Sequence, residues 1–524
     1  MKRPTFNAGS DHLSAGNALD IVRGKHSISI DKNARDRINA SHQAVQTIVA
    51  RKDIVYGINT GFGPLCTTII SESETRKLQE NLLRSHSVGV GENIPTEIAR
   101  MMLVLKLQSL SQGYSGIAIE TLERIIWHLE KGITPVVPSQ GSVGASGDLA
   151  PLAHLFLPLI GLGLVEHNGQ TRDAGGVLRE LGVQPLELGP KEGLALINGT
   201  QFIAAYGVMV LERMQNCLDA ADIIGAMTLE SLLGTQRPFH PLLHDIRPYI
   251  GSRHVAHRLR QLLIDSEMVK SHENCGRVQD PYSLRCMPQV HGASRNAWLH
   301  LKELLDIEIN SVTDNPIILD ADNAISGGNF HGQPMALPLD YVTFAASEIG
   351  NISDRRTYML LEGGVQGLPK LLMKNTGINS GFMIPQYTSA ALVSENKSLC
   401  FPASADSIPT SLGQEDHVSM GSISGRKAFT VLKNLENILA VELLSAAQAF
   451  DFRRPLKSSA VLEACHGLIR QRIDHAEEDR VFAHDINVTH NIVTSKVLVA
   501  TANDTAKKEN IDLNGEFDEL FGIY

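Results

Sequence analysis

The dominant pattern along the chain is the three-and-four spacing of apolar residues that an amphipathic helix requires. Residues 98–110 show this spacing, after a helix-start signal at residues 95–97 and before a stop signal at Gly113. Residues 121–129 repeat the spacing, and Gly132 stands where a left-handed helix C-cap is expected. The sequence therefore predicts two amphipathic helices over these residues.

Two longer stretches, residues 202–233 and 428–450, consist mostly of strong helix formers and carry little charge. A helix with so few charged positions must bury more than one face. Long helices that are buried on several sides are typical of a bundle core, within one subunit or shared between subunits. Strand signals are short, at residues 27–30 and 317–319. We therefore expect a mainly α fold with a long-helix bundle as its core.

Composition narrows the class of protein. Hydrophobic residues make up 43% and charged residues 20% of the 524 residues, as in ordinary folded proteins. The formal net charge of −10 argues against nucleic acid as a partner, and the six cysteines lack CxxC spacing. The first residues lack the apolar core of a signal peptide, and the most apolar stretch, residues 152–164, is shorter than the ~20 residues of a membrane span. We expect a cytoplasmic protein that binds neither nucleic acid nor membrane.

Glycine and turn residues concentrate in four segments, residues 57–64, 141–147, 327–332 and 404–413. In a helical protein, such loops often carry the chemistry. The segment at 141–147 contains Ala145-Ser146-Gly147.

This tripeptide can form an electrophile if a tight loop bends it sharply. The amide nitrogen of Gly147 then reaches the carbonyl carbon of Ala145 and closes a five-membered ring, an approach that the missing Cβ of glycine permits. Loss of water from the ring and from the Ser146 side chain leaves an exocyclic methylidene carbon, a strong electrophile that no ordinary side chain supplies. The alternative is a turn before a helix, with Asp148 as its cap.

The sequence around the tripeptide, GSVGASGDLAPLAH at residues 141–154, resembles the signature of the aromatic amino acid ammonia-lyase family. Six further blocks are similar to the family in the same order. They are VYGINTGFGP at 55–64, ALINGTQ at 195–201, QDPYSLRC at 279–286, SVTDNPI at 311–317, GGNFHG at 327–332 and QEDHVSM at 414–420.

The resemblance carries several expectations. It implies that Ala145-Ser146-Gly147 becomes a 4-methylidene-imidazol-5-one (MIO) group, with no external cofactor and no metal. It implies an ammonia-lyase/fumarase-like architecture in which a smaller mixed region, residues 1–200, carries the active-site loops. Residues 201–524 then form the central long-helix bundle and a C-terminal helical region. It also implies a homotetramer whose sites are built from several subunits.

Residue roles follow from the matched blocks. Tyr56 matches the catalytic tyrosine that the family uses as the base for the β proton, a task that requires a lowered phenol pKa. Arg285 matches the residue that binds the substrate carboxylate, for which its planar guanidinium is suited. The remaining matches are polar positions that line the site, Asn198, Gln279 and Tyr282, and a ring that packs near the electrophile, Phe330.

Other positions bear on which amino acid is deaminated. Ser85 and His86 occupy the family's selectivity position and resemble histidine-specific members, although some tyrosine lyases share the pair. Glu415, within QEDHVSM, is more discriminating, because a carboxylate suits an imidazole and is costly beside a phenyl ring. Met383 also fits a histidine-type pocket. These residues predict conversion of L-histidine to trans-urocanate and ammonia, with Glu415 acting in binding or in acid–base chemistry.

Alternatives remain beside this prediction. A tyrosine lyase or a 2,3-aminomutase would use the same electrophile, and a non-catalytic scaffold would follow if the ring did not close. The pairs His240/His244 and His254/His257 have metal-ligand spacing, but no HExxH or Cys/His framework accompanies them, so a polar surface helix is the favoured interpretation. The serine-loop pattern of fumarase-type lyases and the Walker motif are both missing from the sequence.

Overall fold

The computed structural model describes residues 3–61, 70, 72–273, 276–522 and 524. The chain forms two compact units. Unit 1 contains residues 1–209, 302–340 and 402–426, and unit 2 contains residues 210–301, 341–401 and 427–524. This grouping differs from the expected division at residue 200, because two later segments fold together with the N-terminal part of the chain.

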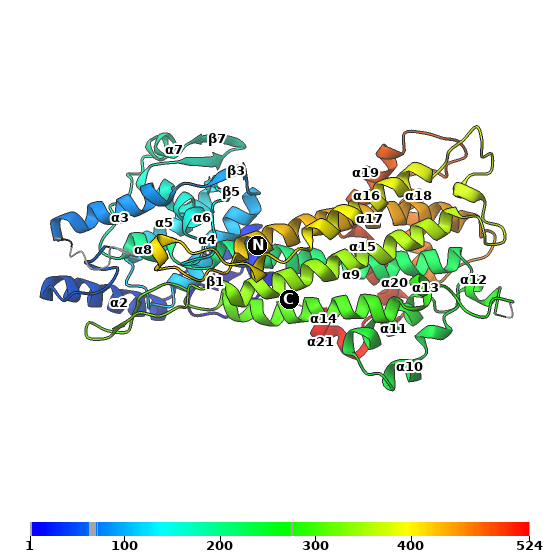
Figure 1. Cartoon of the computed structure of the whole chain (residues 1–524), viewed down its shortest axis with the longest axis horizontal. Coiled ribbons are helices and arrows are strands. Elements are labelled where there is room, and N and C mark those ends of the chain that lie inside the picture. Colours follow the sequence, from blue (N-terminus) through cyan, green and yellow to red (C-terminus); the bar gives the residue numbers. More distant parts are fainter. Residues whose placement is uncertain (1–2, 62–69, 71, 274–275, 523) are drawn as a thin grey trace. The chain divides into compact units, whose positions relative to one another are not determined.

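Unit 1 contains both helices and short strands (Figure 1). The helices are α1 (Ala15–Val22), α2 (Lys32–Arg51), α3 (Glu72–His86), α4 (Thr96–Leu110), α5 (Ile119–Lys131), α6 (Leu149–Phe156), α7 (Ala174–Glu180) and α8 (Glu192–Ile197). The strands are β1 (Thr5–Asn7), β2 (Ser27–Ser29), β3 (Val90–Asn93), β4 (Thr134–Pro135), β5 (Pro138–Gln140), β6 (Leu164–His167), β7 (Gln170–Asp173), β8 (Ile317–Ile318) and β9 (Ala324–Ile325). The β1–β2 pair is parallel, whereas β3–β5, β4–β6–β7 and β8–β9 are antiparallel.

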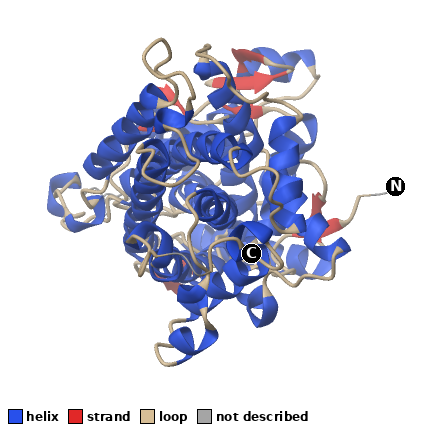
Figure 2. Ribbon diagram, turned by 90° about the vertical axis from the view of Figure 1, so that its right-hand side faces the viewer, coloured by secondary structure: helices blue, strands red, loops and turns tan. Residues whose placement is uncertain are grey.

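Four long helices contribute residues to both units: α9 (Gln201–Ser231), α14 (Met287–Ile309), α15 (Gln333–Leu361) and α17 (Gly421–Asp451). Most of the molecule is helical (Figure 2). The remaining α-helices belong to unit 2. They are α10 (Pro241–Asp245), α11 (Ile250–Leu262), α12 (Glu267–Lys270), α13 (Tyr282–Arg285), α16 (Met383–Leu399), α18 (Ala460–Arg470), α19 (Phe482–Thr494), α20 (Val497–Lys508) and α21 (Asp518–Phe521). Among the described residues, no helix combines the length and the apolar character that crossing a bilayer needs.

The predicted mainly α fold is confirmed, and so are the helices that the apolar spacing indicated. Helix α5 ends at Gly132 in the left-handed conformation, with φ of +65°, as its sequence predicts. Helices α9 and α17 are buried around most of their circumference, which explains their low charge. Helix α17 begins at Gly421, earlier than predicted, because its first turns contain glycine and serine rather than apolar residues.

Two of the paired histidines, His244 and His254, are buried, so the interpretation as a polar surface helix is wrong for them. His244 is 3% and His254 1% exposed. The His254 ring stacks on Phe521 at 4.8 Å with an interplanar angle of 10°. Burial lowers the pKa of His254 to about 2, so this ring is a neutral packing group in unit 2.

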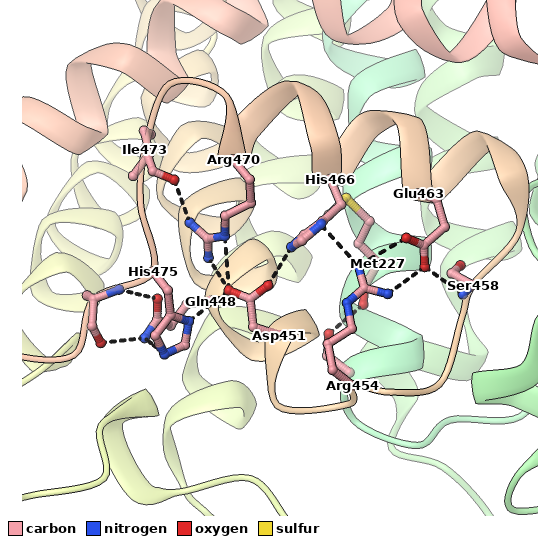
Figure 3. A network of polar contacts seen from close by, with 12 residues as sticks. Met227, Gln448, Asp451, Arg454, Ser458, Glu463, His466, Arg470, Ile473 and His475 are labelled. Atoms are coloured by element: carbon pink, nitrogen blue, oxygen red, sulfur yellow. Dashed lines mark hydrogen bonds and ion pairs between the residues drawn. The ribbon is translucent and has the colours of Figure 1, made fainter.

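A polar cluster around Asp451 ties α17 to α18 and to the segment after it within unit 2 (Figure 3). The Asp451 carboxylate accepts hydrogen bonds from His466 Nε2 at 2.7 Å, from His475 Nδ1 at 2.7 Å and from Arg470 Nε at 2.9 Å. Although burial opposes the charged form, these donors hold the pKa of Asp451 well below its usual range. The carboxylate therefore remains ionised and stabilises the cluster at neutral pH.

Candidate active site

The Ala145-Ser146-Gly147 loop lies between β5 and α6 in unit 1 and is pressed against neighbouring backbone. Gly147 has φ of +71°, and a Cβ there would lie 2.1 Å from the carbonyl oxygen of Gly199. Gly144 has φ of +68°, and its Cβ would lie 2.2 Å from Ser419 Oγ. The positive φ angles favour glycine at both positions, and at Gly147 the neighbouring backbone leaves no room for a Cβ.

Hydrogen bonds hold both the backbone carbonyl and the side-chain hydroxyl of Ser146. Asn198 Nδ2 donates to the backbone carbonyl of Ser146 at 2.8 Å, and Ser146 Oγ donates to Glu415 Oε1 at 2.8 Å. The other carboxylate oxygen of Glu415 accepts from Thr410 Oγ1 at 2.9 Å and from Ser411 Oγ at 2.8 Å. Glu415, predicted from its sequence block, therefore lies directly at the tripeptide.

Asp148 follows the tripeptide and is fully buried. It stands at the start of α6 but makes no side-chain hydrogen bond to that helix. Its carboxylate accepts instead from the Ile203 amide, in the first turn of α9, at 3.0 Å and from Ser142 Oγ at 3.2 Å. Burial raises its pKa to about 7, so Asp148 can exist in either protonation state near neutral pH. Asp148 thus occupies the N-cap position of α6, but the prediction that its side chain caps that helix is wrong, because the carboxylate binds the first turn of α9 instead.

The tripeptide opens onto a cavity of about 760 Å³ that is lined entirely by unit 1 residues. The loop after α2, the end of α3, the residue after α8 and the loops before α15 and α17 all contribute to it. Its lining includes the predicted site residues Tyr56, Ser85, His86, Ala145, Ser146, Asn198, Phe330 and Glu415. Residues from separate parts of the sequence therefore line one cavity together with Ser146.

The selectivity pair lies at the end of α3 and faces this cavity. Ser85 Oγ lies 3.0 Å from His86 Nδ1. Burial lowers the pKa of His86, opposed by a hydrogen bond to the Leu82 backbone and by the charge of Glu415. The net effect favours a neutral imidazole, which can both donate and accept a hydrogen bond.

Apart from Gly147 of the tripeptide, four predicted residues are not among the described residues that line the cavity. Gln279, Tyr282, Arg285 and Met383 belong to unit 2. There the Arg285 guanidinium lies over the Tyr282 ring, 4.6 Å from its centroid, and Tyr282 is 70% exposed. Unit 1 of one chain therefore supplies the tripeptide loop and the polar cavity residues Ser85, His86, Asn198 and Glu415. The last part of the VYGINTGFGP block, residues 62–64, lies outside the described residues.

The structure adds cavity residues to which the sequence assigned no role. His331 and His417 line the cavity, and their rings are parallel, with centroids 5.8 Å apart and an interplanar angle of 5°. His331 lies in the matched block GGNFHG and His417 in QEDHVSM, so the resemblance to the family could have indicated both as site residues. Thr410 and Ser411, the hydroxyl donors to Glu415, fall in the polar 404–413 segment and were indicated only as part of a loop.

Comparison with known proteins identifies the family to which this site belongs. The sequence profile of the family described as "Aromatic amino acid lyase" matches residues 13–471. The chain belongs to the aromatic amino acid lyase family. It is 46% identical to a histidine ammonia-lyase of Myxococcus xanthus over 501 residues, 95% of this chain and 99% of the relative.

Solved structures of aromatic amino acid lyases agree with this assignment. The crystal structure of histidine ammonia-lyase from Trypanosoma cruzi has a TM-score of 0.90 at 42% identity, covering 99% of this chain and 97% of that chain. A tyrosine aminomutase of Streptomyces globisporus has a TM-score of 0.91 at 33% identity, covering 96% and 99%. The expected ammonia-lyase architecture is therefore confirmed, and the chain is a carbon–nitrogen lyase.

Proposed function

We propose that the chain is a histidine ammonia-lyase that converts L-histidine to trans-urocanate and ammonia. The observation that carries this proposal is the Glu415 carboxylate, 2.8 Å from Ser146 Oγ in the cavity that also holds Ser85 and His86. An anionic wall with a neutral imidazole beside it suits an imidazole side chain and disfavours a phenyl ring. Relatives that are named histidine ammonia-lyase, at 43–48% identity, support the same substrate.

The electrophile in this proposal is the MIO group formed from Ala145-Ser146-Gly147. The loop fits the group, since the backbone around Gly147 leaves no room for a Cβ and Asn198 already donates to the carbonyl that would become part of the ring. When formed, MIO supplies an electron-poor carbon that captures the substrate amine and turns it into a better leaving group. Maturation removes the Ser146 hydroxyl, so Glu415 Oε1 loses that donor and remains in the cavity as an acceptor for the substrate imidazole.

The other residues divide the remaining tasks. Tyr56, on the cavity wall, is the proposed base for the β proton of histidine. His86 and Ser85 bind the imidazole with Glu415, and Phe330 packs near the electrophile. Thr410 and Ser411 hold Glu415 in place, so its carboxylate meets the substrate in one orientation.

We further propose a cytoplasmic homotetramer in which other chains complete the site. The basis is membership of the aromatic amino acid lyase family, which implies a homotetramer whose sites are built from several subunits, with an arginine that binds the substrate carboxylate. Arg285 of another subunit would pair with that carboxylate through its planar fork. Sedimentation of the purified chain tests the assembly, and a stable monomer with full activity would refute it.

A substrate assay tests the proposed function. Purified protein is incubated separately with L-histidine, L-tyrosine and L-phenylalanine, and both the conjugated acrylate and the free ammonia are measured. We expect acrylate from histidine alone. Since a tyrosine aminomutase is also a structural neighbour, the tyrosine reaction is additionally searched for the β-amino acid. Turnover of tyrosine without turnover of histidine would overturn the proposal.

A further inference from the structure

Lys106 is a buried cation that the proposed mechanism does not use. It lies in the middle of α4, with an exposed fraction of 0%, between the buried residues Leu105 and Leu107. Removing an ammonium group from water costs several kcal/mol unless partners replace the water. A lysine in such a place therefore points to a specific task for its charge or its hydrogen bonds.

The partner of Lys106 is the backbone next to the electrophile loop. Lys106 Nζ donates to the carbonyl oxygen of Asn198 at 2.5 Å. Burial lowers the pKa of Lys106 to about 7, assisted by the charge of Lys191, whereas the carboxylates of Asp314 and Asp148 favour the charged form. Lys191 itself pairs with Asp314 at 2.8 Å, which leaves the Asn198 carbonyl as the contact through which Lys106 acts.

Asn198 connects this contact to Ser146. Its backbone ends α8, and its side-chain amide donates to the Ser146 carbonyl at 2.8 Å. The next residue, Gly199, accepts from the Asp148 amide at 2.8 Å and lies against Gly147 with no space for a Cβ. The tripeptide therefore packs against the backbone at residues 198–199, and Lys106 hydrogen-bonds to the same segment.

We propose that Lys106 is a positioning residue for formation of the electrophile, acting through the Asn198 carbonyl. This inference rests on the proposed function. Ring closure forms a bond between Gly147 N and the Ala145 carbonyl carbon, and the first water leaves with the Ala145 oxygen and the two amide hydrogens of Ser146 and Gly147. The second water takes the Ser146 hydroxyl and the Ser146 α hydrogen. No oxidant or reductant is needed.

The magnitude follows from how strongly such reactions depend on position. A displacement of about 1 Å at reacting groups costs about a hundredfold in rate. Replacing Lys106 by methionine keeps an unbranched side chain that is one atom shorter, and it removes the donor that holds Asn198. We expect ring closure to slow by about ten- to a hundredfold in Lys106→Met. Lys106→Arg retains a cation and donors, and it should restore most of the maturation.

The test measures maturation rather than turnover. Full-length wild type, Lys106→Met, Lys106→Arg and the control Lys191→Met are purified, and intact mass gives the fraction of chains that lack two water molecules. Lys191 is equally buried, but it donates to the Asp314 carboxylate and the Ser115 carbonyl rather than to Asn198. Helical circular dichroism and thermal melting report folding. We expect Lys106→Met to be folded and largely unmatured, and Lys191→Met to be matured in its folded fraction.

The outcomes separate this inference from the proposed function. A folded Lys106→Met that loses both waters as completely and as fast as wild type overturns the role of Lys106. If Lys106→Met fails to fold, Lys106→Leu, which also lacks a donor, is measured in the same way, and full maturation of its folded fraction also overturns the role of Lys106. If Lys106 only stabilised the fold, Lys191→Met with the same loss of stability as Lys106→Met would also be unmatured. Wild type that retains both waters would instead refute the proposed electrophile.

Discussion

Replacing Glu415 by glutamine is the most informative single change in the proposed substrate pocket. The substitution keeps the size of the side chain and removes its charge. In the structure this carboxylate accepts from Thr410, Ser411 and Ser146. Only the last of these positions is released to the substrate when the Ser146 hydroxyl is lost. The amide of glutamine would therefore present either a weaker acceptor or a donor to the imidazole of histidine.

The size of the effect follows from the bond that is lost. A hydrogen bond to a charged group contributes about 1.5–3 kcal/mol. Since every 1.4 kcal/mol is tenfold, kcat/KM for L-histidine should fall by about 10- to 150-fold in Glu415→Gln. An effect confined to KM would indicate binding alone, whereas an equal loss in kcat would add a role in the transition state.

The assay follows the absorbance of the acrylate product under initial-rate conditions. Each variant is first checked for the loss of two waters by intact mass, because Glu415 also contacts Ser146 before maturation. Asp406→Asn is the matched control, since this exposed carboxylate precedes Glu415 in the same loop and does not line the cavity. Fully matured Glu415→Gln with wild-type kcat/KM would remove Glu415 from substrate recognition.

Three further predictions follow from the geometry. Gly147→Ala should retain the mass of both waters and show no turnover, because its Cβ would lie 2.1 Å from the Gly199 oxygen; mature Gly147→Ala would contradict the tight-loop argument. Tyr56→Phe should mature normally but lose about 10²–10⁴-fold in kcat, as expected for removal of a general base, and an unchanged kcat would assign the base elsewhere. Asp451→Asn should lower the free energy of unfolding by about 1–3 kcal/mol at pH 7. The folded-state pKa of Asp451 is depressed, so its contribution to the free energy of unfolding is present above pH ~4 and is lost as the pH falls further. The melting temperatures of wild type and variant should therefore converge under acidic conditions. A difference in melting temperature that does not vary with pH would contradict this.

The helices were predictable where one face of the sequence repeats regularly. Helix α4 has regular apolar spacing directly after its start signal. Helix α5 is followed by Gly132, whose left-handed conformation ends the helix. Strands such as β4, two residues long, were not predicted, because so short a segment has no measurable alternation. Their formation depends on pairing partners that lie far away in the sequence, as β4 does with β6.

The candidate site was predictable where chemistry leaves a mark on the residue type. Ser146, Gly147 and Glu415 were identified through the resemblance of their sequence blocks to the ammonia-lyase family, and the chemistry of ring closure and of imidazole binding explains their residue types. Lys106 gave no such signal, since an isolated lysine within an apolar helix does not reveal the distant carbonyl that it contacts. The unit 1 cavity likewise depends on segments 315–331 and 411–417 folding back onto the N-terminal part, which no local pattern encodes.

The central claim is that the backbone at Ser146 becomes the electrophile. Proteolysis of active, freshly purified protein followed by high-resolution mass spectrometry of the peptide that contains residues 141–154 measures this directly. The account predicts a peptide lighter than its sequence by two water molecules, with the change confined to Ala145-Ser146-Gly147. An unmodified peptide from protein that turns over histidine at full rate would contradict it.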